Sequence, residues 1–128
     1  MNKCSQKENL LIITRTFTMK VHLIKKKTIE EFALQHTGSR NALSLWLVLL
    51  KEADWNVPRD IIATYPSADL LGNGSNRVVF DIGGNHYRMI FKYYWGITMI
   101  HLSVKWIGTH NAYDWLCSKN EQYTVNLY

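Results

Sequence analysis

Four side chains in the C-terminal half of the sequence have types and spacing that suit a phosphate ligand. Arg88 carries a planar guanidinium that can hold a phosphate through two parallel hydrogen bonds, and Lys105 could neutralise the same charge. His110 follows a predicted strand end, and histidine transfers protons near neutral pH. Tyr113 comes three residues later, close to His110 if the chain is helical there. Taken singly, each also fits an ordinary role on a surface, in a turn or in a core.

Three predicted strands joined by two tight turns position these side chains. Runs rich in Val, Ile, Phe and Tyr, separated by Gly83-Gly84-Asn85 and by Gly96, are typical of β-hairpins. Successive residues of a strand point to opposite faces, so each strand has an apolar face and a face with cations and imidazoles. The apolar sets are Val78 and Phe80; Tyr87, Met89, Phe91 and Tyr93; and Ile100, Leu102, Val104 and Trp106. The opposite sets are Arg77, Val79 and Asp81; His86, Arg88, Ile90 and Lys92; and Met99, His101, Ser103 and Lys105.

The face with cations is expected to be basic. Its charged residues sum to +3, four cations minus one carboxylate: Arg77, Arg88, Lys92, Lys105 and Asp81. The whole chain has a formal charge of +5 at pH 7 and a sequence isoelectric point of about 9.3. Such a balance favours an anionic partner, for example nucleic acid. The alternative is an antiparallel sheet that exposes one polar face to water.

A strand and two helices are predicted ahead of this sheet, which gives an α+β fold. Residues 21–24 favour a short buried strand. Thr28 followed by Glu31 is a capping-box pattern for a first helix. Ser39 is expected to cap a second helix that runs to about Glu52. Apolar residues surround almost the whole second helix, so the first helix or another chain is expected to cover it.

The length of 128 residues fits one domain, predicted over residues 19–117. Residues 1–18 are expected to be an extension, with Met19 as the natural start; an extra strand is the alternative. Residues 59–64 and 111–117 are expected to form short helical turns, and residues 118–128 a weakly patterned tail.

Several classes of protein are disfavoured. The two cysteines, Cys4 and Cys117, form neither a metal spacing nor a disulfide framework, so a reducing, cytoplasmic setting is expected. The longest apolar run, residues 45–50, is shorter than the roughly 20 residues that span a bilayer, so no membrane association is expected.

No metal or other cofactor is expected. His86, His101 and His110 have no Asp, Glu or Cys beside them at a ligand spacing. The sequence also has no phosphate-binding loop, no glycine-rich dinucleotide motif and no serine hydrolase motif.

The region from Arg77 to Asp114 resembles the HigB-type toxins of the RelE superfamily, which are ribosome-dependent mRNA interferases of bacterial type II toxin–antitoxin systems. The resemblance extends over roughly residues 19–116. Its most specific pieces are a Gly-Gly-Asn-x-x-Arg pattern at residues 83–88 and a Thr-His-x-x-Tyr-Asp pattern at residues 109–114. It implies a RelE-like fold: an N-terminal strand and two helices, then a three-stranded antiparallel sheet and a short C-terminal helix.

The resemblance also implies an activity and partners. The toxin would cut mRNA in the ribosomal decoding site without a metal, by attack of the RNA 2′-hydroxyl on the adjacent phosphate. A helix-turn-helix antitoxin of the HigA type would neutralise it. The expected catalytic residues are Arg88 and Lys105 for the phosphate, His110 for proton transfer, and Tyr113 to position an RNA base or to support His110. The expected RNA-binding residues are Arg77, Asn85, His86, Lys92 and His101.

Two other functions fit the same sequence. A non-catalytic RNA- or ribosome-binding module would use the basic face for phosphates and Tyr87, Tyr93 or Tyr94 for stacking. An interaction protein would pair its apolar second helix with a partner. Salt-dependent RNA binding without cut RNA would indicate the first, and the absence of RNA binding the second.

Overall fold

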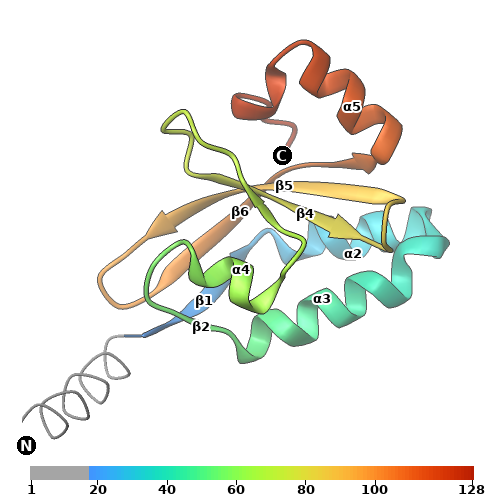
Figure 1. The fold of residues 1–128 in the computed structure, drawn as a ribbon. Helices are drawn as coiled ribbons and strands as arrows, with labels where there is room; N and C mark the ends of the chain where they lie inside the picture. Colours follow the sequence, from blue (N-terminus) through green and yellow to red (C-terminus); the bar gives the residue numbers. More distant parts are fainter. Residues whose placement is uncertain (1–17) are drawn as a thin grey trace, which may run out of the picture.

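Six strands form one sheet in the order β2-β1-β6-β5-β4-β3, in a computed structural model that describes residues 18–128 (Figure 1). The strands are β1 Met19–Ile24, β2 Asp54–Trp55, β3 Asp69–Leu70, β4 Arg77–Ile82, β5 Tyr87–Trp95 and β6 Ile100–Thr109. The helices are α2 Lys26–Gln35, α3 Arg40–Glu52, α4 Asp60–Thr64 and α5 His110–Ser118, with short 3₁₀ turns at Thr37–Ser39 and Glu121–Tyr123.

The α+β class and the β4-β5-β6 meander agree with the sequence prediction, but the expected three-stranded sheet is wrong in extent. β1 is not a separate strand: it pairs in parallel with β6, and every other pair in the sheet is antiparallel. The two-residue strands β2 and β3 extend the two edges. Runs of two residues carry no periodicity, so only pairing with a longer neighbour reveals them.

Helices α2 and α3 cover one face of the sheet, whereas α5 lies on the opposite side (Figure 1). The core under α2 and α3 contains the apolar sets of β4 and β5 that alternation predicts. At its centre the ring of Trp46 lies 5.2 Å from that of Phe91 and 5.1 Å from that of Phe80. Such aromatic contacts add stabilisation beyond area burial.

The predicted helix starts are less accurate. α2 begins at Lys26, before Thr28, and Lys25 precedes it with a φ of 63° and no side-chain cap. The capping box at Thr28 is therefore wrong, because Thr28 lies inside the first turn. Ser39 does precede α3, but its hydroxyl donates to the carbonyl of His36 at 2.6 Å instead of accepting from the helix.

A second hydrophobic cluster fills the middle of the opposite face, so the expectation of an open basic face is wrong there. Its buried members are Leu71, Val79, Ile90, Trp106 and Leu116, with Tyr113, Tyr123 and Val125 packed against them. A β-bulge explains why Trp106 belongs to this cluster and not to the apolar set of β6. Trp106 pairs with Ile90 while Val104 pairs with Phe91, which leaves Lys105 as the extra residue and reverses the alternation beyond it.

The C-terminal tail docks on this same face. Arg77, 6% exposed, donates from Nη1 to the carbonyl oxygens of Gln122 at 3.2 Å and Val125 at 2.7 Å. The backbone N–H of Leu127 donates to the carbonyl of Lys105 at 2.8 Å. Arg77, which the sequence predicts to bind RNA, therefore already anchors the tail.

The outer face of α3 has no cover within residues 18–128, where Leu45, Val48 and Leu49 are exposed. The first helix packs against α3 without burying this stripe. The extension predicted over residues 1–18 lies, but for Thr18, outside the described residues. None of the described helices is long and apolar enough to cross a membrane.

Candidate active site

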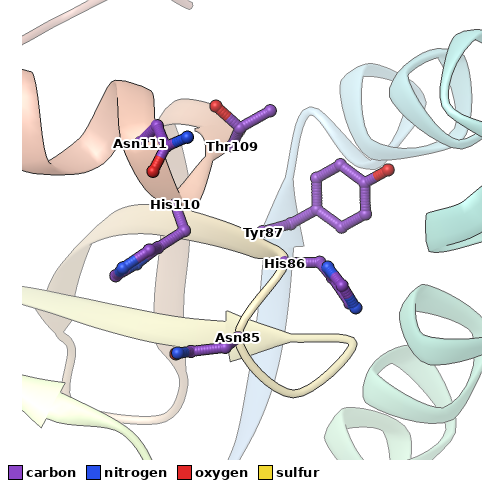
Figure 2. Close-up of a pocket in the computed structure, with 6 residues that line it drawn as sticks. All are labelled: Asn85, His86, Tyr87, Thr109, His110 and Asn111. Atoms are coloured by element: carbon purple, nitrogen blue, oxygen red, sulfur yellow. The ribbon is translucent and has the colours of Figure 1, made fainter.

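A pocket lies where the β4–β5 turn meets the junction between β6 and α5 (Figure 2). Its lining residues are Asn85, His86, Tyr87, Thr109, His110 and Asn111. In Figure 2, His110 and Asn85 point to one side of the turn, and Tyr87 and His86 point to the other. Three predicted site residues, Asn85, His86 and His110, thus meet at one end of the sheet.

Backbone pairing holds the two halves of the pocket together. Tyr87 pairs with Thr109 at the end of the β5–β6 ladder, and the N–H of His110 donates to the carbonyl of His86 at 2.9 Å. The turn needs Gly83 and Gly84, which have φ values of 64° and 66°. The Gly-Gly-Asn piece and the Thr-His piece therefore come together through the sheet register.

The N-terminus of α5 opens into this pocket. Thr109 caps the helix, since its hydroxyl oxygen accepts from the backbone N–H of Ala112 at 3.2 Å. The lining residues His110 and Asn111 belong to the first turn. The positive end of the helix dipole favours an anion at this place.

His110 combines an oriented ring with an unpaired buried nitrogen. Its Nε2 lies 3.3 Å from the Asp114 carboxylate, and its Nδ1 is buried without a hydrogen-bond partner among the described residues. If the neutral ring carries its proton on Nε2, facing Asp114, Nδ1 is left as an acceptor. Asp114 is not among the site residues predicted from the sequence, although its spacing of four residues from His110 on a predicted helix is a usable signal.

Arg88 is buried beside the pocket and holds the turn. Its Nε lies 3.0 Å from Asp81, Nη1 donates to the carbonyl of Tyr87 at 3.1 Å, and Nη2 donates to the Asn85 side-chain oxygen at 2.6 Å. Its exposed fraction is 7%. Three of its five N–H groups are thus engaged. Asp81 is a second residue missing from the predicted site; its register opposite Arg88 is the signal.

Asn85 connects this buried cation to the pocket. Because its side-chain oxygen accepts from Arg88, its NH₂ group is directed away from the guanidinium and can donate to a ligand. Arg88 therefore acts on the pocket through Asn85 as well as through its charge.

Tyr113 belongs to the second hydrophobic cluster and does not line the pocket. Its ring centroid lies 6.1 Å from that of Trp106. Burial, a hydrogen bond with Cys117 and the charge of Asp69 raise the pKa of Tyr113, and the charge of Arg88 opposes them. The hydroxyl therefore keeps its proton at neutral pH.

The other predicted residues lie farther along the sheet. Arg88 pairs with Gly108, so Lys105 is about 10 Å away along β6. The ring of Trp106 lies against Gly108 and would overlap any Cβ at that position.

Lys92 and His101 lie towards the opposite end. Lys92 pairs with Arg77 and stands over the ring of Tyr94, 5.6 Å from its centroid. His101 pairs with His22 of β1, with their Nδ1 atoms 3.0 Å apart. The described residues contain no group of three or more His, Cys, Asp or Glu that could hold a metal ion.

Comparison with known proteins places the sequence in a family. The sequence model of the HigB toxin, a RelE-like toxic component of a toxin–antitoxin system, matches residues 39–116. The chain belongs to this family of HigB toxins. It is also 30% identical over 94 residues to the mRNA interferase HigB of Escherichia coli O6:H1, an alignment that covers 73% of this chain and 89% of that protein.

The HigB match contains the whole candidate site. Every lining residue of the pocket, and Asp81, Arg88 and Asp114 beside it, falls within residues 39–116. Strand β1, helix α2 and the docked tail lie outside the matched segment. The family match thus coincides with the part of the fold that builds the pocket.

Proposed function

We propose that this HigB-family toxin cuts mRNA, and that the cut is made at the pocket between the β4–β5 turn and α5. The observation that carries this proposal is the buried, unpaired Nδ1 of His110. A polar atom of this kind in a native pocket calls for a ligand or a functional role. The name of the E. coli relative, an mRNA interferase, supports RNA as the substrate.

The proposed reaction is a transfer within the RNA itself. The imidazole of His110 takes the proton of a 2′-hydroxyl, the 2′-oxygen bonds to the adjacent phosphorus, and the bond to the 5′-oxygen breaks. The leaving 5′-oxygen takes up a proton from water, and the imidazolium then returns its proton to the solvent, which gives a 2′,3′-cyclic phosphate and a 5′-hydroxyl. Asp114 keeps the imidazole oriented. No metal takes part in this scheme.

Charge on the phosphate grows as the 2′-oxygen attacks, and three groups near the pocket can stabilise it. These are the Asn85 amide, the N-terminus of α5, and the positive charge of Arg88 behind them. Groups fixed in advance stabilise a transition state at little reorganisation cost. In this proposal Tyr113 positions α5, while Lys105, Lys92 and His101 contact neighbouring phosphates. Arg77 acts on the stability of the fold, through the tail that it holds.

The proposal includes the setting of the reaction. The mRNA is cut while it is bound in the ribosome, in the cytoplasm, and a helix-turn-helix antitoxin of the HigA type neutralises the toxin. Since the family is defined by a toxin–antitoxin pair, an antitoxin partner is expected. The net charge of +5 favours binding to a ribonucleoprotein particle.

Induced expression in a bacterial host tests this function. The wild-type protein should arrest growth and produce new mRNA 5′-ends within codons of translated reading frames, and His110→Gln should do neither. If a small helix-turn-helix gene adjoins the toxin gene, its co-expression should restore growth. Soluble wild-type protein that binds ribosomes without new 5′-ends would instead identify a non-catalytic binding module.

A second function rests on α3, whose exposed Leu45, Val48 and Leu49 suit a protein partner. For a HigB toxin the expected occupant is the antitoxin. If Leu45→Lys abolishes every phenotype while RNA stays uncut by the wild type, protein binding is the main activity.

A further inference from the structure

Trp115 has the largest exposed fraction among the aromatic side chains of residues 18–128 that count as exposed. It is 66% exposed, although other residues of α5 pack inward: Leu116 is buried and Tyr113 lies on Trp106. It therefore adds little to the fold. A single exposed apolar residue is common, so Trp115 needs independent observations before it indicates a ligand.

The first such observation is a cation beside the ring. The Nζ of Lys119 lies 4.5 Å from the centroid of the Trp115 ring, within the range of a cation–π contact. An aromatic face next to an ammonium group offers a stacking surface for a base and a counter-charge for a phosphate.

The second observation is continuity with the candidate active site. Asn111, Trp115 and Lys119 are spaced by four residues along α5 and its C-cap, so they form one stripe on the helix. Asn111 lines the pocket, and Trp115 is one helical turn, about 6 Å, farther along the axis. The nearest carboxylate on the helix, that of Asp114, is engaged by His110.

We infer that Trp115 and Lys119 bind the mRNA segment next to the cleaved phosphate, with an unpaired base stacked on the indole and a phosphate on the Lys119 ammonium group. This inference rests on the proposed function, because it extends the same RNA path out of the pocket. The stripe then helps to select single-stranded RNA and to set its position.

Binding of a single-stranded RNA oligonucleotide tests the inference. The RNA carries 2′-O-methyl groups throughout, so it cannot be cut. Trp115→Ala should weaken binding about 5- to 150-fold, which corresponds to 1–3 kcal/mol at 1.4 kcal/mol per tenfold. Trp115→Phe should retain most of the affinity, and Lys119→Met should reduce the salt dependence of binding. Ile97→Ala is the matched control, since Ile97 is 98% exposed in the turn between β5 and β6.

Cleavage of a ribosome-bound mRNA by the same variants separates the two proposals. With Trp115→Ala we expect a higher KM and a nearly unchanged kcat. Wild-type protein that binds RNA through Trp115 without cutting it would support the stripe and contradict the proposed function. Wild-type protein that cuts RNA, with Trp115→Ala equal to it in binding and KM, would overturn the stripe alone. Loss of antitoxin binding in Trp115→Ala with RNA binding intact would also overturn it, in favour of a protein contact.

Discussion

Two buried arginines lie on the same face of the sheet and hold different parts of the chain. Arg88 holds the β4–β5 turn, whose Asn85 and His86 are exposed in the candidate pocket. Arg77 holds the C-terminal tail, whose Gln122 is buried. Two arginines of similar burial and the same charge therefore support the candidate pocket in one region and the docked tail in the other.

The difference shows that the role of a basic residue depends on the groups to which it is hydrogen-bonded, and not only on the face of the sheet where it lies. Strand alternation assigns both arginines to one basic face, and the second hydrophobic cluster divides that face between them. Two ends of the sheet can therefore be distinguished: the turn end, at the β4–β5 turn beside Arg88, and the tail end, where residues 118–128 dock beside Arg77. If the proposed function is correct, the turn end binds the cleaved phosphate, and the tail end stabilises the domain.

The largest effect should come from the turn end. His110→Gln keeps a polar group near Asp114 but removes Nδ1, so single-turnover mRNA cleavage should fall about 10²- to 10⁴-fold. The free energy of unfolding should change little, because His110 is 37% exposed. His22→Gln on β1 is the matched control and should cleave like the wild type. Equal cleavage by the two variants would remove His110 from the reaction.

Two single variants, Arg77→Met and Arg88→Met, test directly whether the two arginines have different roles. Each variant loses hydrogen bonds made by a buried cation, so each should lose about 2–3 kcal/mol of unfolding free energy in urea denaturation. Only Arg88→Met should also lose cleavage among molecules that remain folded, because Asn85 is then unsupported. If folded Arg77→Met protein cleaves as poorly as Arg88→Met, the division of the face is wrong.

Asp114→Asn should have a smaller effect on cleavage, about tenfold, since an exposed ion pair orients a side chain only weakly. The expected loss is in kcat, measured on ribosome-bound mRNA. A loss as large as that of His110→Gln would mean that Asp114 takes part in proton transfer itself.

Tyr113→Phe tests whether Tyr113 serves the candidate pocket or the second hydrophobic cluster. It should have the smallest effect on cleavage, within about threefold at pH 7. The raised pKa of Tyr113 means that the folded state holds its proton while the unfolded state, with a pKa of 10.0, releases it. Stability is therefore fully present below pH 10 and falls as pH rises above it, by at most about 1.4 kcal/mol per pH unit for this group.

Urea denaturation at several pH values above 10 measures this slope. Tyr113→Phe should lose stability less steeply than the wild type. Tyr123→Phe, which changes another tyrosine of the same hydrophobic cluster, serves as the comparison. An unchanged slope in Tyr113→Phe would contradict the burial of the hydroxyl.

Much of the fold follows from the sequence because the periodic segments are long. The β4-β5-β6 meander, the extent of α3 and the position of α5 agree with the prediction within a few residues. Short strands β2 and β3, the parallel pairing of β1 and the bulge at Lys105 depend on contacts between distant segments, which periodicity does not contain.

The candidate site divides in the same way. Asn85, His86 and His110 are brought together as local motifs suggest, because backbone hydrogen bonds join the two turns. The partners Asp81 and Asp114 and the anchoring of the tail by Arg77 were missed, since neither the ion pairs nor the docking of the tail can be read from composition.

The most direct test of the turn-end site is the single-turnover cleavage rate of purified protein on ribosomes programmed with a defined mRNA, corrected for the folded fraction. We expect His110→Gln to lose at least about 100-fold while Arg77→Met equals the wild type. A His110→Gln rate within a few-fold of the wild type, with Arg77→Met strongly impaired, would contradict a turn-end site and place the chemistry at the tail end of the sheet.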